Sequence, residues 1–188
     1  MSERLLKRLP AVWKRLDRHG PSLRVAVDPL SDHVVVVGYG RVGQHIVNVL
    51  GQLGVPRLVM DSDARRVEEL NAQGVPTLFG DAANSEVLMH AVLERARVLV
   101  VTVPEEAAAE VIVTAARKQT PDLPIVVRAA TESGIKRLAM LGADHVVHPE
   151  LEGGLQIVRR TLLQLGFPLS KVQEFEDVVR SESYDLSR

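Results

Sequence analysis

A run of four valines followed at once by a glycine-rich turn constrains the fold of this chain most strongly. Residues 34–37 are all valine, and residues 38–43 read Gly-Tyr-Gly-Arg-Val-Gly. β-Branched residues without polar alternation are typical of a parallel strand that is buried on both faces. Residues 41–53 then repeat apolar side chains at helical spacing. The sequence therefore predicts a buried strand, a tight turn and a helix in immediate succession.

The same alternation of strand and helix continues to residue 166. Asn84 is expected to cap a helix, and Gly74, Gly142 and Gly166 to end helices. Alternation across short loops predicts an α/β fold: a Rossmann-like, doubly wound parallel six-stranded sheet with strand order 3-2-1-4-5-6. The further predicted strands are 58–60, 76–79, 98–103, 125–127 and 145–147, and the further predicted helices are 63–73, 84–93, 105–118, 131–141 and 151–165.

The chain divides into three predicted parts. Residues 1–31 form a basic amphipathic helix and linker, residues 32–166 the Rossmann-like domain, and residues 167–188 a short helix with a frayed tail. Residues 1–24 hold seven Lys or Arg and two Asp or Glu, with apolar side chains at helical spacing. Such a helix can lie on an anionic membrane surface, or it can pack on its own domain or on a partner.

Composition excludes several classes of protein. The chain has no cysteine, which excludes disulfides, cysteine-bound zinc and thiol catalysis. A net charge of −1 and 3% aromatic residues argue against a nucleic-acid partner. No apolar run approaches the roughly 18 residues of a membrane span, and no signal peptide begins the chain, so we expect an intracellular protein.

The turn at residues 38–43 has the form G-x-G-x-x-G between a predicted strand and a predicted helix. Gly38 permits the tight turn, Gly40 lets a phosphate approach the backbone, and Gly43 lets the helix pack close to the sheet. Free N–H groups and the helix dipole at the start of that helix attract a phosphate. A glycine-rich turn without a ligand is the alternative.

Asp61 ends the second predicted strand, where a carboxylate can accept hydrogen bonds from both ribose hydroxyls of an adenosine. NAD(H), AMP, ADP and ATP all carry that group, and the sequence does not choose among them. NADP is disfavoured because the carboxylate would repel a 2′-phosphate, although Arg65 and Arg66 could soften this effect. The alternative is a helix-capping role for Asp61, for which Ser62 and Asp63 compete.

Several motifs follow one another in an order typical of one family. They occupy residues 33–43, 60–63, 80–82, 100–104 and 141–144, the last leading to 148–150. From about residue 32 to 166 the chain resembles the RCK, or TrkA N-terminal, domain, which regulates potassium channels and transporters. The motif at 80–82 separates this family from ordinary dehydrogenases.

The basic segment before the first strand resembles the connector between the membrane and cytosolic parts of Kef-type K⁺/H⁺ antiporters. The resemblance implies a nucleotide-sensing regulatory domain of a potassium transport system, on the cytoplasmic side of the cell membrane. Its partner would be a membrane-embedded K⁺ transporter or antiporter domain, in the same chain or in a separate one. We identify no glutathione-binding motif in the sequence. We also expect no second ligand-binding lobe of the kind found in channel-gating members, because too few residues follow residue 166.

The resemblance also implies which residues form the nucleotide site. Arg41 is a natural charge partner for a phosphate, and a surface or dimer ion pair is the alternative. Glu150 would face phosphates or a divalent ion, or is simply an acid at a helix start. The implied contacts are Gly38, Tyr39, Gly40, Arg41 and Val42 at the phosphates, Asp61 and Ser62 at the ribose, Asp81 and Ala82 after Gly80 beside the adenine, and Thr102, Val103, Pro104, Arg128 and Glu150 along the same crevice.

The family further implies a homodimer through the helix after residue 150, which crosses to a second subunit. Packing of that helix on its own sheet is the alternative. The apolar side chains available for either contact are Leu151, Leu155, Val158, Leu162, Leu163 and Leu165.

The rival interpretation is a stand-alone NAD-dependent oxidoreductase. The Rossmann-like fold takes residues 32–166 and leaves no substrate domain. His145 and His148 are three residues apart on or after a strand, so they point to opposite faces and form no catalytic pair. We therefore expect no catalytic residues, no metal site and no enzyme activity.

Overall fold

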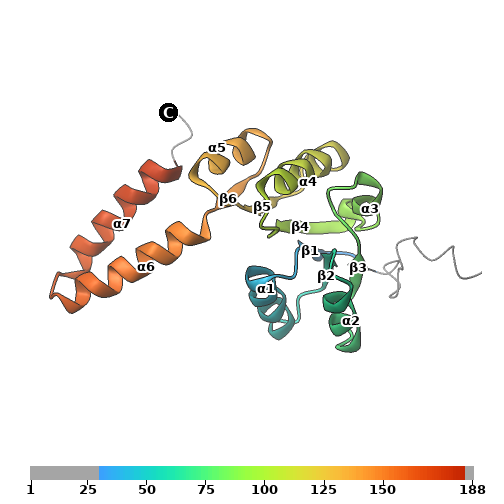
Figure 1. Ribbon diagram of the computed structural model, residues 1–188, viewed down its shortest axis with the longest axis horizontal. Helices are drawn as coiled ribbons and strands as arrows, with labels where there is room; N and C mark the ends of the chain where they lie inside the picture. The colour runs from blue at the N-terminus through green and yellow to red at the C-terminus, as the bar shows by residue number, and fades with distance from the viewer. Residues whose placement is uncertain (1–29, 185–188) are drawn as a thin grey trace, which may run out of the picture.

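The computed structural model describes residues 30–184, in which strands and helices alternate (Figure 1). The predicted basic helix at the start of the chain lies outside the described residues. The strands are β1 (His33–Val37), β2 (Arg57–Asp61), β3 (Thr77–Phe79), β4 (Ala96–Val101), β5 (Ile125–Arg128) and β6 (His145–Val147). The helices are α1 (Arg41–Gln52), α2 (Ala64–Ala72), α3 (Ser85–Met89), α4 (Glu106–Gln119), α5 (Glu132–Met140), α6 (Pro149–Gln164) and α7 (Leu169–Tyr184), with a 3₁₀ turn, η2 (Leu93–Arg95).

The strands form one parallel sheet in the order β3-β2-β1-β4-β5-β6, which confirms the predicted fold and strand order. In the centre of the sheet, Val35 of β1 lies opposite Leu58 of β2 and Leu99 of β4. Helices α1 and α2 cover one face, and α3, α4 and α5 cover the other (Figure 1). The connections after β1 and after β4 therefore leave toward opposite faces of the sheet, which opens a crevice between these two strands.

The valine run of β1 is buried because both faces of the sheet are covered by helices. Val35 and Val37 belong to the larger core cluster, with side chains of α3, α4 and α5. Val34 and Val36 belong to the smaller cluster, with side chains of α1 and α2. Every valine of the run is at most 8% exposed, which explains the absence of polar alternation.

Side-chain caps and glycines set the helix ends. Asn84 accepts from the backbone N–H of Glu86, so the predicted cap is confirmed. Gly74, Gly142 and Gly166 follow the ends of α2, α5 and α6 with φ values of +72°, +101° and +84°, a left-handed conformation that glycine adopts without strain. None of the helices within residues 30–184 has both the length and the apolar character needed to cross a bilayer.

Two stretches differ from the sequence prediction. The helix predicted over 84–93 is interrupted between α3 and η2, where Val92 has a left-handed φ of +50°. The short helix predicted after residue 167 is a helix of 16 residues, α7, which lies beside α6 (Figure 1), and the predicted tail after Tyr184 lies outside the described residues. Glu176 of α7 contacts α6 through an ion pair with Arg159 at 2.7 Å.

The close packing of α1 on β1 predicts opposite effects for two helical glycines. A Cβ on Gly43 would overlap the carbonyl oxygen of Gly38, whereas a Cβ on the exposed Gly153 of α6 meets nothing within 4 Å. We expect Gly43→Ala to lower the free energy of unfolding by about 1–3 kcal/mol. Gly153→Ala should raise it by roughly 0.5–1 kcal/mol. Urea unfolding followed by circular dichroism measures both, and an unchanged or raised free energy of unfolding for Gly43→Ala would contradict the packing described at that residue.

Candidate functional site

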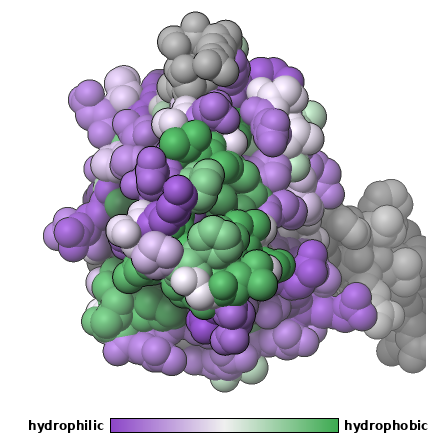
Figure 2. All heavy atoms as spheres, turned by 90° about the vertical axis from the view of Figure 1, so that its left-hand side faces the viewer, coloured by the Kyte–Doolittle hydropathy of each residue, from purple (hydrophilic) through white to green (hydrophobic). Residues whose placement is uncertain are grey.

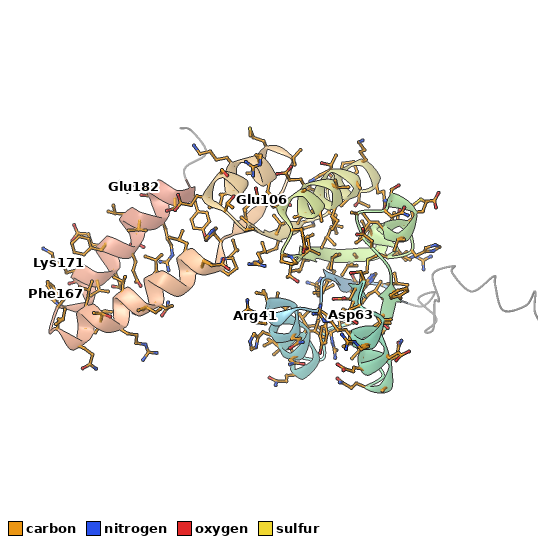
Figure 3. All side chains as sticks on the ribbon, viewed as in Figure 1. Arg41, Asp63, Glu106, Phe167, Lys171 and Glu182 are labelled. Carbon is orange, nitrogen blue, oxygen red and sulfur yellow. The ribbon has the colours of Figure 1, made fainter. Side chains whose placement is uncertain are left out.

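A cleft of about 700 Å³ opens at the edge of the sheet where the strands end. Arg41, Asp63 and Glu106 mark the starts of α1, α2 and α4 around this edge (Figure 3). Of the predicted site residues, all but Tyr39 line the cleft. They are Gly38, Gly40, Arg41, Val42, Asp61, Ser62, Gly80, Asp81, Ala82, Thr102, Val103, Pro104, Arg128 and Glu150.

The glycine turn keeps the end of β1 and the start of α1 close together. Gly38 has a φ of +94°, and the hydroxyl of Thr102 donates to its carbonyl oxygen at 2.8 Å. A Cβ on Gly40 would meet nothing within 4 Å, so the space above this residue is open to the cleft. The start of α1 can therefore present backbone N–H groups to an anion, as its position after a parallel strand predicts.

Tyr39 is the exception among the predicted phosphate contacts. Its side chain is 8% exposed and packs in the smaller core cluster, away from the cleft. Its backbone N–H donates to Oδ2 of Asp61 at 2.5 Å. Tyr39 therefore anchors the turn, and the side chain does not line the cleft.

Asp61 connects the glycine turn with the start of α2. Its Oδ2 accepts from Tyr39 and its Oδ1 accepts from the backbone N–H of Asp63 at 2.7 Å. Asp63 caps α2 by accepting from the N–H of Arg65, so the alternative capping role is taken by Asp63. A carboxylate has about four lone-pair positions. Asp61, which also lines the cleft, therefore retains acceptor capacity toward a ligand hydroxyl.

The two arginines after Asp61 have different surroundings. Arg66 lines the cleft, and its guanidinium lies 3.4 Å from Oδ2 of Asp61. The side chain of Arg65 is 88% exposed and its nearest acid is Asp63 at 3.7 Å. Only Arg66 is therefore placed to moderate the charge of Asp61 toward a ligand.

Other lining residues were missed by sequence reasoning. His45 lies one turn after Arg41 on α1, Glu105 directly follows Pro104, and Pro149 starts α6. The helical spacing of four residues between Arg41 and His45 was the available signal for the histidine. Glu105 and Pro149 adjoin predicted residues, and only their immediate sequence neighbours could have suggested them.

Arg128 and Glu150 close one side of the cleft with an ion pair of 3.0 Å. The pKa of the Glu150 carboxyl lies below its usual value. The main cause is a hydrogen bond from the backbone N–H of Glu150 itself, and the positive charge of Arg128 adds to the effect. Glu150 therefore lies in the first turn of a helix and also lines the cleft, so its position agrees with both alternatives given for it. The part of the chain that the structure describes contains no cluster of three His, Cys, Asp or Glu suited to a metal ion.

The two histidines near β6 have different positions. His145 begins β6, whereas His148 caps α6 and accepts from the backbone N–H of Leu151 at 3.0 Å. His148 therefore has a structural role at the start of α6.

Comparison with known proteins places the chain in a family. The TrkA-N domain family matches residues 34–149. The chain belongs to the TrkA-N family. A relative named as the K(+) efflux antiporter KefB of Alkalimonas amylolytica is 33% identical over 159 residues, which is 85% of this chain and 24% of the relative. The chain thus spans about a quarter of the length of that relative.

Solved structures of TrkA-N and related domains have the same fold. The TrkA-N domain of the inner membrane protein YbaL from Escherichia coli is 35% identical, with a TM-score of 0.65 over 73% of this chain and 98% of that one. The C-terminal domain of Kef from Shewanella denitrificans, described in an AMP-bound form, has a TM-score of 0.71 over 82% of this chain and 96% of that one. At 23% identity, this second likeness concerns the fold alone.

The hydrogen bonds of Asp61 predict a stability effect in the TrkA-N domain without any ligand. Asp61→Asn leaves one acceptor oxygen for the two N–H groups of Tyr39 and Asp63, so we expect the free energy of unfolding to fall by about 1–3 kcal/mol. Asp63→Asn is the matched control, because asparagine caps a helix as well as aspartate. Thermal unfolding measures both variants, and equal midpoints would contradict the role given to Asp61.

Proposed function

We propose that this TrkA-N domain is a nucleotide-sensing regulatory domain of a potassium transport system. Its cleft binds NAD(H) or an adenine nucleotide, AMP, ADP or ATP, and the bound nucleotide regulates transport. The observation that carries the proposal is the arrangement of the cleft, in which the open backbone at Gly40 and the carboxylate of Asp61 line the same space. An anion site beside a sugar-diol acceptor suits a nucleoside phosphate.

The role proposed for the cleft is binding, and no catalysis is assigned to it. Regulation requires only that the nucleotide bind one arrangement of the protein more tightly than another. NADP is disfavoured because Asp61, 6% exposed, would repel a 2′-phosphate, while Arg66 reduces that repulsion without removing it. The AMP-bound form named for the Kef relative supports the adenine nucleotide class.

The proposed partner is the membrane-embedded part of a K⁺/H⁺ antiporter, in the same chain or in a separate one. The relative named as a K(+) efflux antiporter extends well beyond the region that matches this chain. In this arrangement the TrkA-N domain lies on the cytoplasmic side of the membrane, and no nucleic acid is involved.

A homodimer through α6 and α7 is the second part of the proposal. The hairpin of these helices extends from the sheet, and apolar side chains gather on the surface that it presents (Figures 1 and 2). Of the residues predicted for this contact, Leu155 is buried within the protomer, whereas Val158, Leu163 and Leu165 are 47%, 40% and 69% exposed. Ile157, Phe167, Leu169, Phe175 and Val178 extend the exposed apolar surface. Exposed apolar groups that lie together mark interaction surfaces.

Nucleotide titration tests the proposed ligand class. At a concentration of 100 times Kd, a ligand that binds only the folded protein stabilises it by about 2.7 kcal/mol. We expect AMP, ADP, ATP, NAD or NADH to raise the unfolding temperature, and Gly40→Ala to weaken that shift because its Cβ would enter the open space above the turn. Gly153→Ala, at a residue that does not line the cleft, is the matched control. A rise in unfolding temperature with NADPH alone would contradict the role given to Asp61. If none of the nucleotides raises the unfolding temperature, the proposed function is rejected.

Sedimentation equilibrium tests the proposed dimer. Val158 of α6 and Leu165, the C-cap residue of that helix, are seven residues apart, so they lie on the same side. The double change Val158→Asp and Leu165→Asp should convert the protein to a monomer, because it places charge in an apolar contact. Met140→Asp, at a residue of α5 that is 78% exposed, should leave the mass unchanged. A dimer that survives the double change would exclude this surface.

A further inference from the structure

Two sets of polar contacts meet at the first turn of α6, one from the cleft and one from the last turn of α7. The set from the cleft begins at Arg128, whose guanidinium contacts Glu150 in the first turn of α6. Tyr184, the last residue of α7, contacts the same turn at the backbone N–H of His148, although Tyr184 and His148 are more than thirty positions apart in the chain. The contact between α6 and α7 therefore reaches the side of the cleft that Glu150 forms.

Arg128 lines the cleft and has unused hydrogen-bonding capacity. Its Nε is buried without a partner, and Glu150 is the acceptor within bonding distance of its terminal nitrogen. An arginine has five N–H donors arranged to bind an anion with two parallel bonds. Glu150 is 59% exposed, so its hold on Arg128 is open to competition from a phosphate in the cleft.

Tyr184 fixes the turn that carries Glu150. Its hydroxyl accepts from the backbone N–H of His148 at 3.2 Å and donates to Oε1 of Glu152 at 3.3 Å. Arg180 donates to Glu152 at 3.0 Å, and this bond holds the pKa of the Glu152 carboxyl below its usual value. Burial raises the pKa of Tyr184, so at neutral pH a protonated hydroxyl faces a charged carboxylate.

We propose that Tyr184 is a positioning residue of the nucleotide cleft, which holds Glu150 on Arg128 and so opposes the binding of a ligand phosphate to Arg128. The inference rests on the proposed function, because it concerns a nucleotide phosphate in the same cleft. A phosphate that takes Arg128 releases Glu150 and loosens the contact between α6 and α7. By linkage, loosening that contact strengthens phosphate binding by the same factor.

A double-mutant cycle with ADP as the probe tests this coupling. Isothermal titration calorimetry is applied to the unmodified chain, Tyr184→Phe, Glu150→Gln and the double variant. We expect each single change to raise ADP affinity about fivefold, the size that the loss of one net hydrogen bond allows. The double variant should gain no more than the stronger single variant, because both changes release the same ion pair.

One control variant, one substitute variant and one further measurement distinguish positioning from a general structural role. Ser181→Ala removes a hydroxyl of the same helix that donates to the carbonyl of Val178 in its own turn, so ADP affinity should not change. Glu152→Gln weakens the acceptor of Tyr184 and should raise ADP affinity if Tyr184→Phe does not fold. Hydrogen exchange of residues 180–184 in the unmodified chain should become faster when ADP binds.

The outcomes are distinguishable from those of the proposed function. If the unmodified chain binds none of ADP, AMP and NAD, the proposed function fails and this inference fails with it. If ADP binds but Tyr184→Phe weakens binding, leaves it unchanged, or adds its full effect to that of Glu150→Gln, the positioning role alone is overturned.

Discussion

The close approach of α1 to the end of β1 is the constraint on which the cleft depends. Gly43 lies against the carbonyl of Gly38, and Thr102, which directly follows the neighbouring strand β4, donates a hydrogen bond to that same carbonyl. Because no Cβ separates the helix from the sheet, the first turn of α1 begins at the point where the chain leaves β1. The N–H groups of that turn therefore lie in the crevice where the connections of β1 and β4 diverge.

The polar side chains of the cleft also hold parts of the protein together. Asp61 joins the glycine turn to the start of α2, and Arg128 joins β5 to the start of α6. The two differ in what a ligand would require of them. The carboxylate of Asp61 can share its remaining lone pairs with a sugar hydroxyl. A phosphate and Glu150, in contrast, are both anions and would compete for the guanidinium of Arg128. In the proposed coupling, sharing leaves the fold unchanged, whereas competition for Arg128 links the ligand to the position of α6.

Much of the site could be predicted from the sequence because its residues directly follow strands. Asp61, Asp81, Thr102 and Arg128 come at or just after the ends of β2, β3, β4 and β5, and parallel strands bring such residues to one edge. Tyr39 was assigned to the phosphates with its neighbours, but its side chain packs beneath the turn. His45 and Arg66 were not assigned to the site, because whether a helical side chain reaches a cleft depends on how the helix packs.

The sequence by itself determined the alternation of strands and helices, the glycine turn and the acid after the second strand, because these depend on local conformation and on a burial pattern of short range. Only the tertiary structure decided that α7 is a full helix on α6, that Tyr184 reaches the amide of His148, and that Arg128 meets Glu150. Those contacts join residues distant in the chain. Each charged or polar group alone suits solvent equally well, so its partner is defined only when the fold brings the two together.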